Sequence, residues 1–408
     1  MKKILAIFIA FALIGLSAMA QAPNWAWAET SNSHATGYDR ALGVTTDASG
    51  NVYATGYYKR SSITFGSTTF LTQGNEDMYL VKYSPNGAVI WAVSAGGNNI
   101  DEGHGVATDA AGNIYVTGYF QSDSITFGST TLHNDTTNHS ADIFLVKYAP
   151  NGSVIWAKSA GGGKFDFGYS VATDTFGNVY IAGAFASSTI TFGAYTFVNS
   201  GTSTSIFLVK YDTNGNVIWA ANPIGDGNGA TCVVTDQTGN SYITGAFQST
   251  SVSFGSIVLN NTGGQDMFIA KYYSNGTVAW AKSSNGIWNE SGSSVAADAF
   301  GNVYVTGNFQ SHVVSFGQDT IHNYHIQNDE NIFLVKYDIN GNVLWAKIEG
   351  GGSTELSNSI AVDLSGHFYI SGYFISDTLF LDTAYIINAH ANEDIFLAKS
   401  KRKQSICH

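Results

Sequence analysis

The sequence contains little cysteine, little proline and few charged residues. Its 408 residues include two cysteines, Cys232 and Cys407, and four prolines, and only 12% of its residues are charged. Two cysteines cannot build a disulfide framework, although the sequence leaves open whether these two pair. Because so few residues are charged, the polar surface must be made largely from Ser, Thr, Asn and Gly. Such a composition is typical of an extracellular β-protein rich in turns.

Basic residues are also scarce. The formal net charge is −12, and it becomes −14 if Lys2 and Lys3 are removed. No cluster of Lys and Arg is present that would bind phosphate groups, so nucleic acid and anionic lipid are excluded as expected partners.

The first twenty residues have the pattern of a secretory signal peptide. Lys2 and Lys3 precede an apolar run over 4–16, and Ala18-Met-Ala20 is a small-x-small cleavage site. No later apolar run is long enough to span a membrane. The sequence therefore predicts a protein exported through the general secretory pathway and secreted or held at the outer cell surface.

A repeat fills the remaining chain. An Asp is followed by Gly three residues later and Tyr six residues later, at steps of 62, 65, 62, 62 and 65 residues. These turn aspartates are Asp47, Asp109, Asp174, Asp236, Asp298 and Asp363. The pattern predicts one domain of six repeats over 21–399, followed by a short basic tail over 400–408.

The second repeat divides into short strands separated by turn signals. Strands are expected over 106–109, 113–120, 142–148 and 154–158, with a small extra hairpin over 124–132. The strand over 142–148 is almost continuously apolar, which indicates burial on both faces. No stretch has a helical period. Four antiparallel strands per repeat predict an all-β fold, a six-bladed β-propeller with an extra short hairpin in each blade.

The two ends of the chain suggest how the ring closes. Each of the first five repeats ends in a strand with a Trp-Ala pair, whereas the sixth stops near Lys399 without one. The same pair occurs at Trp27 and Ala28, just after the signal peptide. We therefore expect the N-terminal strand to complete the last blade, which removes an exposed sheet edge.

These motifs resemble a known repeat family. The pattern Val-Ala-Thr-Asp-x-x-Gly-Asn-x-Tyr-x-x-Gly, followed by Ile-Phe-Leu-Val-Lys-Tyr and Asn-Gly-x-Val-x-Trp-Ala, is similar to the SBBP-type β-propeller repeat over residues 24–399. The resemblance implies an exported bacterial surface protein, and many members carry a C-terminal domain for type IX secretion. This chain ends differently, at His408, so the sequence leaves its surface anchoring open.

One acidic column recurs at the predicted mouth of the central channel, eight residues before each turn aspartate. Its members are Asp39, Asp101, Asp166, Asn228, Glu290 and Glu355. A ring of oxygen ligands at the channel mouth would suit a hard cation such as calcium. The alternative, which a feature copied into every blade favours, is that each side chain caps backbone N–H groups of its own loop.

Other candidate residues have structural explanations. The turn aspartates are expected to bond their own backbone. The Trp-Ala column resembles the docking repeat of quinoprotein dehydrogenases, but no haem or cofactor motif accompanies it. Cys232 lies where the other repeats have Gly or Ser, which favours a small buried residue. His322 and His325 form the only close histidine pair that suggests zinc, and the aromatic residues Phe165, Phe167, Trp288 and Tyr324 could contact sugars.

Two functions remain open at this stage. The first is a non-enzymatic, monomeric scaffold that binds a glycan or a surface protein, without a cofactor other than a possible calcium ion. The second is a polysaccharide-active enzyme, a hydrolase or lyase, with its site at the loop-face mouth of the channel. Asp101, Glu102 and His104 form the most titratable cluster there, and no other repeat matches it. Trp288 is a further candidate on the same face.

Overall fold

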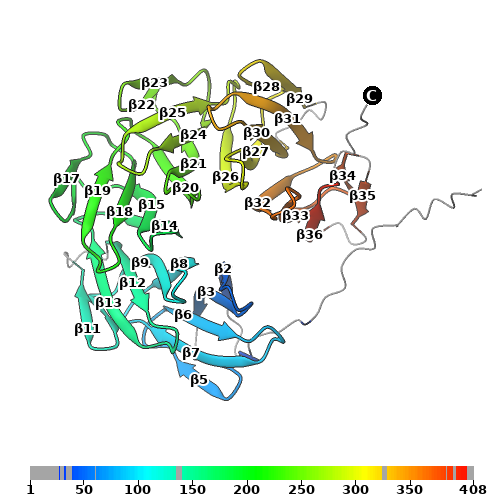
Figure 1. Cartoon of the computed structure of the whole chain (residues 1–408). Helices are drawn as coiled ribbons and strands as arrows, with labels where there is room; N and C mark the ends of the chain where they lie inside the picture. Colours follow the sequence, from blue (N-terminus) through cyan, green and yellow to red (C-terminus); the bar gives the residue numbers. More distant parts are fainter. Residues whose placement is uncertain are drawn as a thin grey trace, which may run out of the picture.

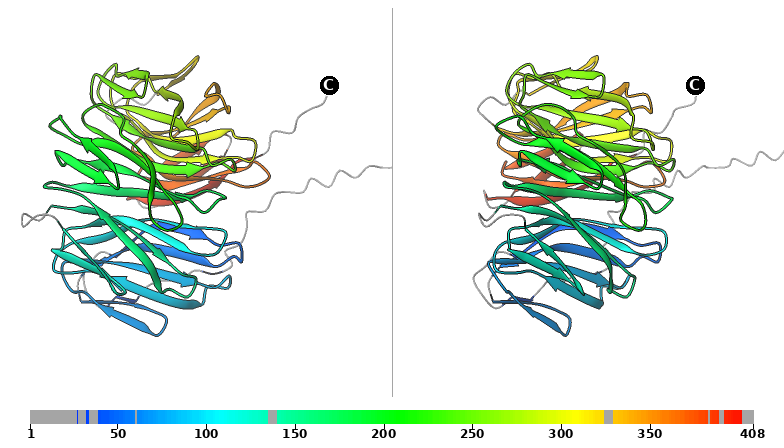
Figure 2. Two further views of the ribbon diagram at one scale, coloured as in Figure 1. Left: turned by 60° about the vertical axis from the view of Figure 1, so that its left-hand side comes forward. Right: turned by 90° about the vertical axis from the view of Figure 1, so that its left-hand side faces the viewer.

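The computed structural model describes residues 27, 32–33, 39–59, 61–134, 140–323, 329–382, 384–388 and 392–401. These residues form strands and turns and contain no helix. Their sheets stand side by side around a common centre, as the blades of a propeller (Figure 1). Figure 2 shows the same blades from the side, with their strands running across the thickness of the ring.

The first five blades each contribute four strands, counted outward from the centre, and the described part of the last blade contributes three. The innermost strands are β2 (Arg40–Thr46), β8 (Asp101–Thr108), β14 (Asp166–Thr173), β20 (Asn228–Thr235), β26 (Glu290–Ala297) and β32 (Glu355–Val362). The second strands are β3 (Val52–Lys59), β9 (Ile114–Phe120), β15 (Val179–Phe185), β21 (Ser241–Phe247), β27 (Val303–Phe309) and β33 (Phe368–Phe374). The third strands are β6 (Glu76–Tyr83), β12 (Asp142–Tyr148), β18 (Ser205–Tyr211), β24 (Asp266–Tyr272), β30 (Asn331–Tyr337) and β36 (Asp394–Lys399). The outermost strands are β7 (Val89–Ala95), β13 (Val154–Ala160), β19 (Val217–Ala221), β25 (Val278–Ser283) and β31 (Val343–Glu349).

A two-stranded hairpin follows the second strand of every blade, as expected. The hairpins pair β4 (Ser62–Phe65) with β5 (Thr68–Leu71), β10 (Ser124–Phe127) with β11 (Thr130–His133), β16 (Thr189–Phe192) with β17 (Tyr195–Val198), β22 (Ser251–Phe254) with β23 (Ile257–Asn260), β28 (Val313–Phe316) with β29 (Asp319–His322), and β34 (Thr378–Leu381) with β35 (Ala384–Ile387). A short strand, β1 (Asn32–Ser33), adds to β4. The hairpin turn needs a left-handed residue, which is Gly128 in the second blade and Asp382 in the last.

The predicted all-β, six-bladed fold is confirmed, with one difference in the innermost strands. The strand expected over 106–109 begins five residues earlier, at Asp101, and pairs with the full length of β9. A β-bulge between Gly103 and Gly105 shifts the register midway. The earlier start matters because it puts Asp101, Glu102 and His104 on a strand, where side chains alternate between two faces.

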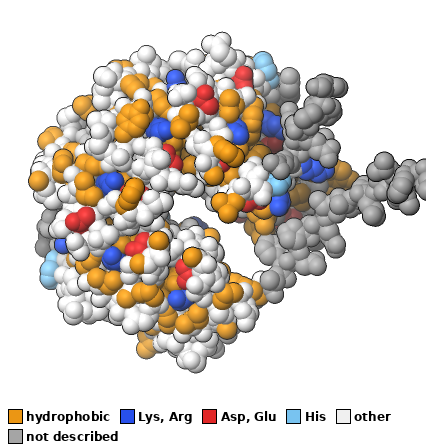
Figure 3. Space-filling model, viewed as in Figure 1, with side chains coloured by type: hydrophobic (Ala, Val, Ile, Leu, Met, Phe, Trp, Pro, Cys, Tyr) orange, Lys and Arg blue, Asp and Glu red, His pale blue; other side chains and the backbone are white. Residues whose placement is uncertain are grey.

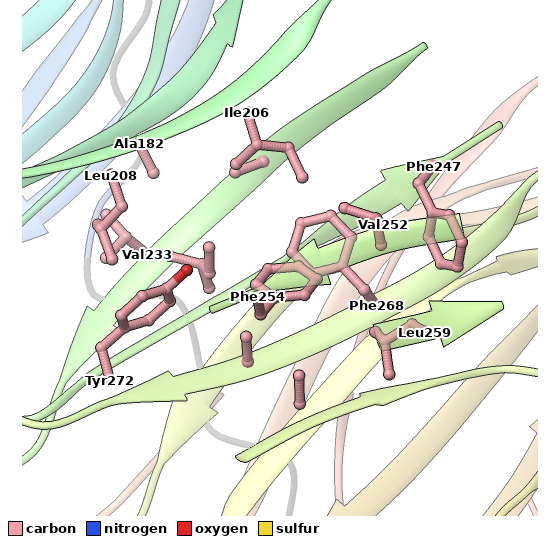
Figure 4. Close-up of a cluster of buried hydrophobic side chains, with 14 of the residues drawn as sticks. Ala182, Ile206, Leu208, Val233, Phe247, Val252, Phe254, Leu259, Phe268 and Tyr272 are labelled. Carbon is pink, nitrogen blue, oxygen red and sulfur yellow. The ribbon is translucent and has the colours of Figure 1, made fainter. Parts of the chain in front are cut away.

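The hydrophobic core lies between neighbouring blades. Figure 4 shows the cluster between the third and fourth blades, whose members include Leu208 of β18, Val233 of β20 and Phe268 of β24. The third strands of the first five blades are buried on both faces, which explains their continuous apolar sequence. Comparable clusters lie at the other junctions that involve blades two to six.

The repeated Asp, Tyr, Lys and Trp residues form one contact set that joins each blade to the next. In the second blade, Asp109 accepts hydrogen bonds from the backbone of its own turn and from the Tyr115 hydroxyl. Lys147 lies 5.1 Å from the centre of the Tyr115 ring, and its Nζ donates to the carbonyl of Thr213 in the third blade. Trp156 Nε1 donates to that same carbonyl at 3.2 Å. The turn aspartate and the tryptophan are therefore fully accounted for by structure.

The N-terminal contact follows the same rule. Trp27 Nε1 donates to the carbonyl of Pro85 in the first blade at 3.0 Å. That is the position which a tryptophan of the last blade would occupy, because each tryptophan contacts the following blade. The other residues of the predicted closing strand, 24–26 and 28, lie outside the described residues, and the described part of the last blade has the three strands β32, β33 and β36.

The ring is least tightly packed where its ends meet. Innermost strands of consecutive blades pack together from β2 through β32, but no comparable packing joins β32 to β2 in the described residues. Figure 1 shows the widest separation between the first blade (blue) and the last (red). Within the described chain, no helix is long and apolar enough to cross a membrane.

Candidate functional site

The predicted acidic column does not face the channel. Asp101, Asp166, Glu290 and Glu355 are fully buried, with 0% of each residue exposed. Asp39 is partly exposed and accepts a hydrogen bond from the backbone of Lys59. The side chain of Asn228 is outside the described part of the chain. The expected ring of accessible carboxylates is therefore wrong for the four buried members.

The buried members instead cap the connections between blades. Asp101 accepts hydrogen bonds from the Gly97 amide at 2.7 Å and from the Ser122 hydroxyl at 2.6 Å. Asp166 accepts from the amide and the hydroxyl of Ser187 in the same way. These contacts agree with the alternative interpretation, in which the column serves the loops. Burial raises the pKa of Asp101 to about 6, although the Ser122 hydrogen bonds oppose that rise.

Glu102 and His104 lie on the opposite face of β8, on the inner rim of the ring. Both are half-buried, and His104 Nε2 lies 2.9 Å from Glu102 Oε2. Burial raises the pKa of Glu102, but hydrogen bonds from His104 and Tyr119 outweigh it and leave the pKa below its ordinary value. The Glu102 carboxylate is therefore held ionised beside an imidazole and a phenol.

Aromatic rings continue this group onto the third blade. Phe165, Phe167 and Tyr169 occupy alternate positions at and just before β14, so their side chains share one face. Neighbouring rings are stacked, with centroids 6.1 and 5.7 Å apart. Tyr119 packs edge-on against Phe167 at 4.9 Å. His104 reaches Tyr119 at 5.4 Å and Tyr169 at 5.8 Å.

We call these six residues the inner-rim cluster. It consists of Glu102, His104, Tyr119, Phe165, Phe167 and Tyr169. Phe165 lies nearest the mouth formed by the inter-blade connections, with 46% of the residue exposed, and Tyr169 lies deeper. Figure 3 shows the central opening of the ring from one face.

The inner-rim cluster breaks the repeat. The positions of Glu102 and His104 are occupied by Gly229 and Thr231 on β20. On β26 they are Ser291 and Ser293. The inner wall is thus aromatic and charged over the second and third blades, and small and polar over the fourth and fifth. On the second and third blades a ligand would meet aromatic ring faces and the Glu102 carboxylate. The matching positions of the fourth and fifth blades offer neither.

Sequence reasoning identified four of the six residues and missed Tyr119 and Tyr169. It also treated the aromatic residues as scattered, because Tyr119 and Phe167 are 48 positions apart in the chain. The signal that could have grouped them is the repeat itself. Residues at the same position of consecutive innermost strands are neighbours around the channel. A position whose residue type changes from blade to blade therefore indicates a part of the inner wall that differs from the rest.

Trp288 forms a separate, smaller site between the fourth and fifth blades. Its ring lies 4.8 Å from that of His312, and its amide donates to the Ser311 hydroxyl. Neither residue touches the inner-rim cluster through a contact seen in the described structure. Tyr324 and His325, also considered from sequence, lie outside the described residues.

Metal and thiol predictions were tested only in part. Across the described ranges, no group of three or more His, Cys, Asp or Glu side chains is placed to hold a metal ion. Calcium binding stays a prediction. Cys232 is partly buried against Ser294, and burial raises the pKa of its thiol. Cys407, with which the sequence left a disulfide open, lies outside the described residues.

Comparison with known proteins agrees with this fold. The family model described as a beta-propeller repeat, SBBP, matches residues 90–122 and 156–184. The chain carries the SBBP beta-propeller repeat. A WD repeat-containing protein of Acanthamoeba polyphaga mimivirus is 25% identical over 409 residues, which cover 82% of this chain and 29% of that protein. The chain therefore spans less than a third of the length of that relative.

Solved structures align with this chain only at low identity and low TM-score. The WD40 domain of Neurospora crassa Pan2 aligns with a TM-score of 0.38 and 9% identity, covering 84% of this chain and 74% of that one. A glucose dehydrogenase aligns with a TM-score of 0.37 and 10% identity, covering 84% and 96%. Likenesses at this level say nothing about the activity of the SBBP-repeat chain.

Proposed function

We propose that this SBBP-repeat protein is an exported, non-enzymatic binding scaffold whose ligand contacts the inner-rim cluster. The observation that carries the proposal is the asymmetry of the inner wall. The turn aspartates and the tyrosines, lysines and tryptophans packed with them are repeated and are used in joining blades. The inner-rim cluster is not repeated, is partly open, and lies on a rigid scaffold, as binding sites commonly do.

A carbohydrate is the ligand class that suits this cluster best. The apolar faces of sugar rings pack against aromatic rings, and Phe165 offers the most exposed ring of the stack. Sugar hydroxyls are also good partners for an ionised carboxylate, and Glu102 supplies one beside His104. Binding would then need a few well-placed polar groups among apolar walls.

Export rests on the signal-peptide pattern over 1–20. The expected outcome is that expression of the full chain in a Gram-negative host yields a mature form that begins near residue 21 in the periplasmic or extracellular fraction. N-terminal mass spectrometry of that fraction checks it. An intact Met1 and retention in the cytoplasm would contradict the export part while leaving the binding part open.

Glycan-array binding with matched variants tests the ligand. Phe165→Ala and His104→Ala should each weaken retained binding by at least about tenfold, since each removes a contact worth about 1.4 kcal/mol or more. Phe300→Ala is the control because Phe300 is also an exposed aromatic residue, but it lies at the tip of a repeated turn. Equal binding by all three variants, or no array binding by the wild type, would contradict the proposal.

The enzymatic alternative retains one specific observation, the hydrogen bond between Glu102 and His104. Such a pair could act as a base toward a polysaccharide. A general acid needs a carboxyl group with a raised pKa. The carboxyl groups with raised pKa values, such as those of Asp101 and Glu290, are fully buried and therefore out of reach of a substrate. Sustained product release by the wild type that is abolished in Glu102→Gln would favour the enzyme. Asp101→Asn, suggested by the sequence alone, would change stability rather than turnover.

A further inference from the structure

Glu102 is the acidic residue of the inner-rim cluster, and its carboxylate is partly open to solvent. The Glu102 side chain is 12% exposed and the His104 side chain 21%. Asp101, the neighbour of Glu102 on β8, is fully buried by contrast. A ligand on the inner wall can therefore reach the Glu102 carboxylate directly.

This carboxylate keeps acceptor positions for a ligand. His104 Nε2 lies 2.9 Å from Glu102 Oε2 and can donate as the cation or as the Nε2–H tautomer. The Tyr119 hydroxyl is a second hydrogen-bond partner. An ionised carboxylate has about four lone-pair positions, so these two donors leave room for a third. His104 and Tyr119 also hold the carboxylate in one orientation, which lowers the entropy cost of binding.

No lysine or arginine neutralises the Glu102 carboxylate in the described part of the chain, where its ion-pair partner is His104. Lys59 of β3 pairs with Glu76 of β6 at 2.6 Å. Glu76 itself lies close enough to interact with Glu102. Arg40 takes the place of Glu102 on β2 and is exposed, and it forms no ion pair with a described residue.

Acids outnumber bases around this carboxylate. Three acids stand against two bases, namely Asp39, Glu76 and Glu102 against Arg40 and Lys59. The whole chain has a formal net charge of −12. A negative potential at the mouth of an opening raises the local concentration of cationic ligands. The field at the inner rim therefore favours a ligand group of positive charge.

The exposed aromatic ring has the same preference. Phe165, Phe167 and Tyr169 are stacked with nearly parallel planes, at 15° and 17° to each other. Phe167 covers one face of Phe165, and 46% of Phe165 is exposed. The face of an aromatic ring carries negative potential and attracts a cation as well as the apolar face of a sugar.

Three kinds of glycan would differ at this site. A uronic acid brings a second carboxylate to Glu102, and like charges repel. A neutral sugar offers a hydroxyl group as donor. The ammonium group of an amino sugar gives a hydrogen bond in which both partners are charged, and such bonds are shorter and stronger. The inner wall therefore favours an amino sugar over a neutral sugar, and a neutral sugar over an acidic one.

We propose that the glycan bound at the inner-rim cluster carries cationic amino groups, and that one of them pairs with the Glu102 carboxylate while a sugar unit stacks on Phe165. This inference rests on the proposed binding function. His104 and Tyr119 act here as positioning residues, because they orient the carboxylate that contacts the ligand.

The protonation states of the cluster agree with this assignment. The hydrogen bonds from His104 and Tyr119 outweigh burial and hold the pKa of Glu102 below its ordinary value, so the carboxylate keeps its charge. Burial raises the pKa of Tyr119 and that of Tyr169. Both phenols therefore stay neutral near pH 7, and the Tyr119 hydroxyl stays a donor.

Titration calorimetry of the full chain with two matched tetrasaccharides tests the inference. One is a glucosamine tetramer, whose amines are largely protonated at about pH 6, and the other is the N-acetylglucosamine tetramer, which is neutral. The wild type should bind the amine tetramer at least about tenfold more tightly, because a hydrogen bond between charged partners contributes more than a neutral one.

Glu102→Gln is the decisive variant, since it keeps the size of the side chain and removes its charge. It should lower the affinity for the amine tetramer at least about tenfold and change that for the neutral tetramer less than about twofold. Glu393→Gln is the matched control, because Glu393 is an exposed acid of the last blade and has no described contact with the inner-rim cluster. It should leave both affinities unchanged.

Salt supplies a measurement that needs no variant, in case Glu102→Gln does not fold. Raising the salt concentration from about 0.05 M to about 0.5 M should weaken wild-type binding of the amine tetramer and leave the neutral tetramer unaffected.

Two sets of results separate this inference from the proposed function. Binding of the neutral tetramer as tight as that of the amine tetramer would overturn the inference and leave the binding function standing. A preference for an oligogalacturonate would also overturn it, since Arg40 rather than Glu102 would then set the selectivity. Failure of the wild type to bind any glycan would overturn both.

Discussion

The two ends of the ring use their side chains differently. At the end with the Asp-x-x-Gly turns, the blades repeat the same aspartate, tyrosine and lysine, and the first five also repeat the tryptophan. In the second blade each of these is engaged by its own turn or by the next blade. Toward the end with the inter-blade connections, the inner-rim cluster occurs once. Residues that recur in every blade hold this propeller together, and residues that occur in one place are available to a ligand.

The largest expected effect comes from breaking the repeated contact. Trp219→Ala removes a buried ring that packs on Gly276 and donates to the carbonyl of Ser274. We expect a loss of about 3–4 kcal/mol in the free energy of unfolding. Urea denaturation measures it. The ligand affinity of the folded fraction should be unchanged. A loss of affinity without a loss of stability would contradict the assignment of structure to the repeated residues and of binding to the inner-rim cluster.

A somewhat smaller effect is expected from Lys210→Met. The Lys210 ammonium lies 3.3 Å from the buried Asp174 carboxylate and donates to Ser274 of the next blade. Removing it leaves a buried charge with fewer partners, which should cost about 3 kcal/mol. Thermal unfolding compared with Lys347→Met, whose ion pair with Asp382 is exposed, checks this. Equal losses in the two variants would contradict it.

Phe167→Ala should have the reverse profile. Phe167 is half-buried between Phe165 and Tyr169, so its removal should cost only about 1–2 kcal/mol of stability. It should nevertheless weaken glycan binding by more than tenfold, because it collapses the stack against Tyr119. Calorimetric titration with an array-selected glycan measures the affinity. Unchanged affinity would remove the inner-rim cluster from consideration.

The smallest effect expected is a pH response of binding. Hydrogen bonds from His104 and Tyr119 keep the pKa of Glu102 below its ordinary value of 4.5. Its ionised form is therefore favoured in the folded protein, and carboxylate-dependent affinity should persist down to pH 4.5 and fall only below it. Affinity measured from pH 7 to pH 4 checks this. A fall that begins above pH 5 would show that another group controls binding.

The fold could be predicted almost completely from the sequence because six copies of each turn and strand signal reinforce one another. The candidate site could be predicted only in part. The innermost strand was expected to begin at residue 106, so Asp101 was placed in a loop at the channel mouth. Because the strand begins at Asp101, alternation turns that side chain into the blade junction and Glu102 toward the rim.

Contacts between distant strands were harder to predict. Nothing in the local sequence shows that Tyr119 meets Phe167, since the repeat period gives the register within a blade but not the packing between blades.

The forward direction of the tryptophan and lysine contacts bears on how such a protein can grow. Each repeat carries donors for the blade that follows it and an acceptor carbonyl for the blade that precedes it. A duplicated repeat therefore brings both halves of the contact with it, and it matches its new neighbours without any compensating substitution. Gene duplication can lengthen such an array one blade at a time, and the geometry of the closed ring then limits how many copies are kept.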